Sequence, residues 1–332
     1  MLGGKVISSS NNTYSYRSLF DVLLNYGEEA KNTQLEMGLF TKDTPNHMDE
    51  VDTDKENVGL NRRFEFTKNS KNVHLMGRVH SDLFHQGRFL INGLPLRLIF
   101  HRSKDSFILL SGKENPTYRI RLTEATLCVR RVELTPEKFR EINQTLATIP
   151  ILYPINRVVV KTHSMAAGLM SLNWDNAILG QIPNRVILGM VDNDAYAGSY
   201  KKNPFNLKKF SISSVGVFVN GESLPAKPLK LNFEQSDFLD GYRSLFTCTG
   251  KINRDEGVGI SISDYAHGYT LFGFDLTPAF CNGAHQEIIK KGNVRIVLDF
   301  STPLTRTITL VAYCDYDNII TVDKTRNVLT DF

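Results

Sequence analysis

The side chains that most often carry chemistry are scattered along this sequence. Its eight histidines are spread over 332 residues, and the closest pair, His80 and His85, flanks a turn after an expected strand. A metal site there would need a third ligand that converges on both rings, so we predict loop or surface histidines and no bound metal. The sequence also lacks G-x-S-x-G, HExxH and Walker-type motifs. It therefore predicts a protein that is not an enzyme and uses no cofactor.

A lysine-rich loop is the best candidate for contact with a polyanion. Its basic residues surround Asn203-Pro204-Phe205 and are Lys201, Lys202, Lys208 and Lys209. Neighbouring lysines could face DNA and neutralise its phosphates. The other interpretation is a solvated loop, since runs of lysines are common on protein surfaces. Both interpretations stay open at this point.

An acidic, turn-rich segment occupies residues 42–59. Its carboxylates at 49, 50, 52, 54 and 56 do not follow the spacing of an EF-hand loop, and the glycine that such a loop needs is missing. We therefore predict a solvated surface loop here.

The composition is that of a folded protein rich in strands. Hydrophobic residues make up 41% and charged residues 22%, which excludes a disordered chain. The 20 Phe and 12 Tyr favour strands over helices. A net charge of +4 is small for a dedicated nucleic-acid binder. No stretch approaches the roughly 20 apolar residues of a membrane span, and the four widely spaced cysteines are expected to be buried free thiols.

The second half of the sequence contains a regular series of strand signals. Alternating or β-branched apolar runs lie at 156–163, 185–191, 210–225, 269–276, 293–300 and 307–323. Within one of them, Asn220-Gly221 favours the positive φ values of a tight hairpin turn. Short strands at steady spacing predict a β-sandwich or barrel.

The first half has weaker strand signals and two expected helices. The expected strands lie at 72–84, 88–102, 106–111 and 118–134, and one helical region at 15–35. The second helix begins with Thr135 as N-cap and Pro136 in the first turn, and Pro150 and Pro154 follow it. We predict three parts: a first domain at 1–134, a helix and Pro-rich linker at 135–154, and a second domain at 155–332.

The pentapeptide YRSLF occurs at 16–20 and again at 242–246. Similar elements follow both copies in the same order, with the matched pairs Asp82/Asp275, Arg97/Arg295 and Cys128/Cys314. We interpret the chain as two tandem jelly rolls, each made of two facing antiparallel sheets. The second copy is complete, whereas the first lacks its opening strands. We therefore expect Met1 to lie inside a former internal hairpin.

Several stretches carry a family resemblance. They are NNTYSYRSLFDVLLNYGEEAK, MGRVHSDLFHQGRFLINGLPLRLIFHRSKDSFIL, AILGQIPNRVILGMVDNDAYAGSYKKNPFNLKKF, VNGESLPAKPL and YDNIITVDKTRNVLTDF. With these, the chain resembles the double jelly-roll major capsid protein of Polinton (Maverick) elements and adintovirus-like viruses, over nearly its whole length. Members of that family carry further strands ahead of the glycine turn at which this sequence starts.

The resemblance implies a structural role in a virion. Three subunits would form a pseudo-hexagonal capsomer, and capsomers would tile an icosahedral shell. The implied partners are other copies of the chain, a minor single jelly-roll capsid protein and, weakly, packaged DNA. Synthesis is expected in the host cytoplasm and assembly in the nucleus. One interpretation of the missing start is an inactive endogenous copy of such a gene.

Two other functions fit a jelly roll and stay open. A carbohydrate- or protein-binding module is the main alternative, although a lectin would want aromatic platforms and the only tryptophan is Trp174. A cupin-type enzyme would need clustered histidines and carboxylates on its strands, and the sequence does not show that pattern.

Overall fold

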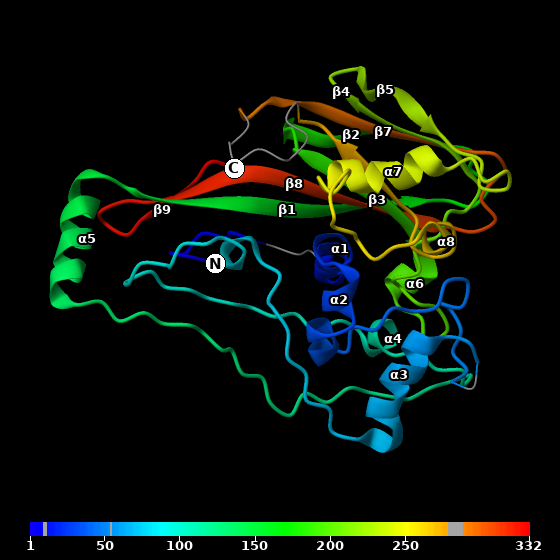
Figure 1. Ribbon diagram of the computed structural model, residues 1–332, viewed down its shortest axis with the longest axis horizontal. Coiled ribbons are helices and arrows are strands. Elements are labelled where there is room, and N and C mark those ends of the chain that lie inside the picture. The colour runs from blue at the N-terminus through cyan, green and yellow to red at the C-terminus, as the bar shows by residue number, and fades with distance from the viewer. Residues whose placement is uncertain (9–11, 54, 278–287) are drawn as a thin grey trace.

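The computed structural model describes residues 1–8, 12–53, 55–277 and 288–332 (Figure 1). Its strands all begin after residue 150 of the described chain. They are β1 (Ile151–Met165), β2 (Ser171–Gln181), β3 (Arg185–Asp192), β4 (Ile212–Val219), β5 (Glu222–Lys230), β6 (Leu271–Asp275), β7 (Lys291–Phe300), β8 (Ile308–Val322) and β9 (Val328–Thr330).

The strands form two antiparallel sheets with a distinctive order. One sheet runs β1-β8-β3-β6, with β9 added to β8, and the other runs β2-β7-β4-β5. The pairs β1·β8, β2·β7, β3·β6 and β4·β5 are those of one long hairpin folded back on itself. The further pairs β3·β8 and β4·β7 roll that hairpin into two layers. This is the strand order of a jelly roll, so the predicted β-sandwich is confirmed for residues 151–330.

The expected strands of the second half are all present, and Asn220-Gly221 turns the chain between β4 and β5. Strand β2 was not predicted from the sequence. Its register shifts between Trp174 and Ile178, which breaks the alternation of apolar residues that identifies a strand.

The first half differs from the prediction of a second sandwich. Its helices are α1 (Tyr14–Asn25), α2 (Glu28–Lys31), η1 (Gln34–Gly38), α3 (Val58–Thr67), η2 (Lys68–Ser70), η3 (Asp82–Phe84), α4 (Asp105–Ile108) and α5 (Pro136–Thr148). The described part of residues 1–150 contains no strand apart from isolated bridges that involve Leu2. The predicted jelly roll at 1–134, complete or partial, is therefore not formed.

The physical reason is that a strand needs a neighbour. The apolar residues at 118–134 have the sequence of a strand, yet Leu122 and Val129 are 68% and 61% exposed. Figure 1 shows this part of the chain, between α4 and α5, as a long extended trace away from the sandwich. Helix α5 begins as predicted, with the Thr135 side chain accepting from the Lys138 N–H. The division into domains at this helix stays a prediction.

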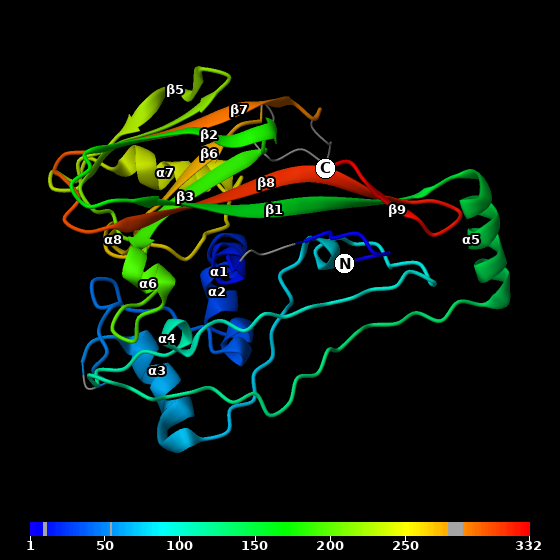
Figure 2. The ribbon, with the colours of Figure 1, turned by 180° about the vertical axis from the view of Figure 1, so that it is seen from behind.

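Helices cover the sheet that contains β1 and β8. Helix α1 contacts both strands, and Figures 1 and 2 place it with α2 on the face turned away from the second sheet. As a result β3 is buried at every position but its first, and β8 at its first nine positions. The apolar side chains of both sheets and of α1 form one large core, and the start of β1 and the end of β8 form a second, smaller cluster with Leu2 and Leu83.

The described residues contain three further helices, α6 (Asn193–Ala197), α7 (Leu239–Cys248) and α8 (Ile262–Ala266). Helix α7 contacts β5 and β6, the edge strands of the two sheets, and so closes one side of the sandwich. It approaches β6 so closely that a Cβ at Gly273 would overlap Cys248 Sγ and lie 2.9 Å from the Ser244 carbonyl oxygen. Only glycine fits at that point of the contact.

Candidate functional site

A cluster of buried charged residues lies where α1 meets the sheet. The exposed fractions of Arg17, Asp21 and Asp82 are 5%, 3% and 1%. Arg17 and Asp21 lie one turn apart on α1, and Asp82 opens the short helix η3. Charged residues are almost never buried to this extent unless they are paired, so their partners define the cluster.

Arg17 and Asp82 form the central ion pair. Arg17 Nη2 donates to Asp82 Oδ1 across 2.6 Å, and the same oxygen accepts from the Val158 backbone N–H at 3.1 Å. Because Val158 belongs to β1, this one carboxylate joins α1, η3 and the sheet. Removing either partner would leave an uncompensated buried charge.

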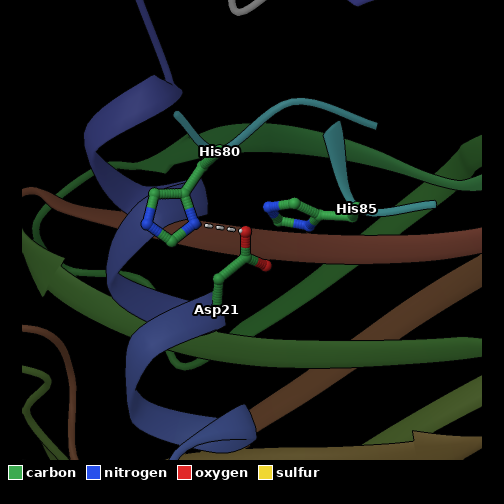
Figure 3. A group of neighbouring side chains, drawn as sticks. All are labelled: Asp21, His80 and His85. Carbon is green, nitrogen blue, oxygen red and sulfur yellow. Dashed lines mark hydrogen bonds and ion pairs between the residues drawn. The ribbon is translucent and has the colours of Figure 1, made fainter. Parts of the chain in front are cut away.

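Asp21 accepts hydrogen bonds from two further side chains, and Figure 3 shows the one from His80. The Tyr313 hydroxyl of β8 donates to Oδ1 across 2.7 Å, and Nδ1 of His80 lies 2.8 Å from Oδ2. Burial raises the pKa of Asp21, but the hydrogen bonds from His80 and Tyr313 and the charge of Arg17 outweigh it and hold this pKa below its ordinary value. Asp21 is therefore ionised at neutral pH.

His85 completes the group drawn in Figure 3. Its ring lies 5.7 Å from that of His80, centroid to centroid, in an edge-to-face arrangement. Burial, followed by the charge of Arg78, lowers the pKa of His85 to about 4, so its imidazole is neutral at pH 7. The ligand atoms of Asp21, His80 and His85 all lie within 4.8 Å of one another. The sequence shows no third ligand for the two histidines. In the structure Asp21 of α1, 59 residues before His80, takes that place.

The lysines of the predicted DNA-facing loop lie in different surroundings. Lys208 Nζ donates to Asp49 across 2.6 Å and to Asp192 across 2.7 Å. Lys202 pairs with Asp194 at 2.6 Å. Lys209 lies over the ring of Phe233, and Lys201 is exposed. Two of the four lysines are therefore already neutralised by carboxylates, and contact with DNA stays a prediction.

The acidic loop at 42–59 is docked rather than solvated, contrary to the prediction. Met48 is 2% exposed and Asn57 is fully buried. Asp49 accepts from Lys208 and from the Asn203 backbone, and Asp43 accepts from the Asn203 side chain. The loop folds down because its carboxylates meet the lysine-rich loop, which lies some 150 residues later in the sequence.

Two of the described cysteines are buried. They are Cys248, whose thiol donates to the Leu245 carbonyl, and Cys314, whose pKa burial raises to about 12. Cys128 is free but exposed, contrary to the expectation that it would be buried, because the segment around it forms no sheet. Cys281 lies outside the described residues. None of the helices in the described part combines the length and apolar character of a membrane span.

Comparison with known proteins gives a consistent but distant picture. No protein-family model matches the chain. An uncharacterised protein of Caenorhabditis elegans is 27% identical over 331 residues, which is 98% of this chain and 76% of that protein.

Several solved structures from viral capsids resemble the chain. A quasi-atomic model of the PBCV-1 virus capsid matches 58% of this chain at 8% identity with a TM-score of 0.37. The mavirus major capsid protein matches 55% at 10% identity with a TM-score of 0.30. This chain spans 54% of the first and 41% of the second, so it covers about half of their length or less. Since both TM-scores are low, the fold assignment rests on the strand order described above.

Proposed function

We propose that this chain is a structural subunit of a capsid, of the kind made by Polinton-like elements, and that three copies associate into a pseudo-hexagonal capsomer of an icosahedral shell. The observation that carries the proposal is the strand order β1-β8-β3-β6 facing β2-β7-β4-β5. A closed, rigid sandwich whose interior is apolar suits a building block that must present side faces to neighbours. The sequence stretch GQIPNRVILG, which supports the family resemblance, covers the end of β2 and most of β3.

The alternative functions receive less support from the site. A cupin-type enzyme would hold its metal ligands inside the sandwich, whereas the space between the sheets is filled by apolar side chains. The group Asp21, His80 and His85 lies on the outer, helix-covered face instead. A carbohydrate-binding module would use an exposed aromatic platform, but Trp174 is partly buried and stacks near His163 at 4.9 Å.

The proposal includes partners and a location. Neighbouring capsomers and a minor single jelly-roll capsid protein would contact the sides of the sandwich, and the location would be the virion. Packaged DNA would meet mainly the exposed Lys201, because Lys202 and Lys208 are paired with aspartates. Synthesis would take place in the host cytoplasm and assembly in the nucleus, and the chain would be inactive if its first half does not fold in the shell.

The test is the assembly state of the purified full chain. Size-exclusion chromatography with light scattering is expected to give a trimer of the 37.5 kDa chain, and electron microscopy to show six-sided particles or closed shells. A strict monomer at all concentrations that binds a glycan array would contradict the proposal and favour the binding module. A salt titration of DNA binding by wild type and by Lys201→Ala tests the basic loop. An unchanged slope of affinity against salt would remove Lys201 as a phosphate contact.

A further inference from the structure

We propose that Asp21, His80 and His85 form a binding site for a divalent transition-metal ion of the zinc class. The proposal does not depend on capsid assembly. It rests on three side chains whose ligand atoms lie within 4.8 Å of one another, Asp21 from α1 and His80 and His85 from either side of η3 (Figure 3). It rests also on the chemistry of these ligands and on the hydrogen bond from Tyr313 that orients the carboxylate.

The pair Asp21 and His80 needs only a small adjustment to hold an ion, and the ligand atom of His85 lies within 4.8 Å of both. Zinc binds nitrogen and oxygen at roughly 2.0–2.2 Å, so two ligands of a tetrahedral site lie about 3.3 Å apart. Asp21 Oδ2 and His80 Nδ1 are 2.8 Å apart, joined by a hydrogen bond. An ion would replace the proton of that bond, and the two atoms would separate by about half an ångström to reach the tetrahedral spacing.

The donor set fits zinc and its neighbours in the first transition row. Two imidazoles and one carboxylate suit zinc, iron, cobalt and nickel, whereas calcium and magnesium prefer oxygen ligands alone. An uncharged imidazole offers the lone pair that coordination requires. Three protein ligands leave the fourth tetrahedral position to water.

Tyr313 acts as the outer partner that a ligating carboxylate usually has. Its hydroxyl donates to Oδ1 of Asp21 at 2.7 Å, which leaves Oδ2 to face the histidines. Such hydrogen bonds fix the direction of a ligand and are a regular part of metal sites. Tyr313 is on β8, so an ion held by Asp21 would be anchored to the centre of the sheet.

The nearby charges both oppose and favour a cation. Arg17 Nε lies 3.8 Å from Asp21 Oδ2, and the charge of Arg78 acts on His85. Against these stand the carboxylates of Asp21 and Asp82, and Asp82 Oδ1 holds Arg17 Nη2 at 2.6 Å. The arginine adjacent to Asp21 is therefore partly compensated, and we expect micromolar rather than nanomolar affinity.

The consequence of metal binding would be mechanical. The ion would join α1 to the segment around η3, and through Tyr313 both would be held on the sheet. Binding to the folded chain alone stabilises it in proportion to the ligand concentration. Zinc would therefore raise the melting temperature of the whole chain.

The experiment is a titration of the chelator-treated full chain with Zn²⁺ by calorimetry, and with Co²⁺ by absorption. One ion per chain and the visible bands of tetrahedral cobalt are expected. His85→Ala and His80→Ala should each lower the affinity for zinc by at least roughly 10- to 100-fold. That is the loss seen when only a hydrogen-bond partner of a metal ligand is removed. His74→Ala, at an exposed histidine, should bind as wild type does.

Folding of each variant is checked by circular dichroism in the absence of metal, since His85 lacks the carboxylate contact of His80 and should be replaceable without loss of structure. The proposal fails if wild type shows no saturable binding up to 100-fold excess of zinc over protein. It also fails if folded His85→Ala and His80→Ala retain the affinity of wild type. A shell that assembles equally well with and without zinc would leave the capsid proposal intact.

Discussion

The two copies of YRSLF form helices with different surroundings. In α1 the buried side chains are Tyr16, Arg17, Phe20, Asp21, Leu23 and Leu24. In α7 they are Gly241, Leu245 and Cys248. When the two copies of YRSLF are aligned, the buried positions of α7 fall one residue earlier than those of α1. This corresponds to a rotation of about 100° about the helix axis. The same five letters therefore present different faces to the protein.

The difference lies in what each helix packs against. Helix α1 covers the face of a sheet, where Arg17 turns inward to Asp82 of η3 and Asp21 accepts from the Tyr313 hydroxyl of β8. Helix α7 closes an edge of the sandwich at Gly273 and buries Leu245 instead, while Arg243 is exposed. The comparison teaches that a local sequence can specify a helix while its neighbours decide which side is buried.

The largest effect should separate the two arginines. Arg17→Met is expected to cost about 3–5 kcal/mol of unfolding free energy, because it leaves Asp82 buried without its cation. Arg243→Met should change stability by no more than about 0.5 kcal/mol, since it is a surface substitution. Urea unfolding followed by fluorescence measures both. Equal losses would mean that the two helices are not distinguished by their buried charge.

A second pair of substitutions compares the close contacts beneath the helices. Gly273→Ala should destabilise the chain by about 2–3 kcal/mol, because the new methyl group meets Cys248 and the backbone of α7. Gly189→Ala beneath α1 should cost about 1 kcal/mol, because its neighbours are the ends of side chains that can move. The nearest of these are Leu271 Cδ2 at 2.9 Å, Leu207 Cδ2 at 3.0 Å and Phe20 Cζ at 3.4 Å. Thermal unfolding of both variants tests this order, and a reversed order would contradict the rigid contact at α7.

The smallest effect concerns Lys31, which links the two helical regions. Its Nζ donates to the Leu23 carbonyl at the end of α1 and to the Val258 carbonyl in the loop after α7, at 2.7 and 2.5 Å. Burial, and then the charges of Lys42 and Lys251, lower its pKa from 10.5 to about 7. Between pH 7 and 10 the unfolded chain therefore binds more protons than the folded chain, so stability should rise with pH.

Lys31→Met removes this titration. The stability of wild type relative to Lys31→Met is expected to increase by about 1–2 kcal/mol from pH 7 to pH 9. Urea unfolding at several pH values measures the difference, with the exposed Lys201→Met as the control. Parallel pH curves for wild type and Lys31→Met would show that Lys31 keeps its ordinary pKa in the folded chain.

The sandwich could be predicted from sequence where its signals are local. β-branched runs such as 185–191 identify buried strands, and Asn220-Gly221 identifies a hairpin without any knowledge of its neighbours. Helix α7 was not predicted, because YRSLF was read only as a sign of a repeat. The strand-like run at 118–134 led to a wrong prediction, since pairing depends on a second strand as well as on alternation.

The candidate site could not be predicted in the same way. His80 and His85 are close in sequence, but Asp21 reaches them only when α1 packs on the sheet. Tyr313 lies in the middle of an apolar strand, where nothing local marks it as a partner of Asp21. The acidic loop and the lysine-rich loop are each visible in the sequence. Their contact depends on the tertiary fold, which brings the two distant segments together.

The bond between Tyr313 and Asp21 joins residues 292 positions apart. At a translation rate of about 5–20 residues per second, α1 leaves the ribosome roughly 15–60 s before the strand that receives it has been synthesised. During that interval α1 has only the earlier strands, such as β1, to pack against, and the surface of β8 is missing. The packing of this early helix is therefore completed only after β8 has been made.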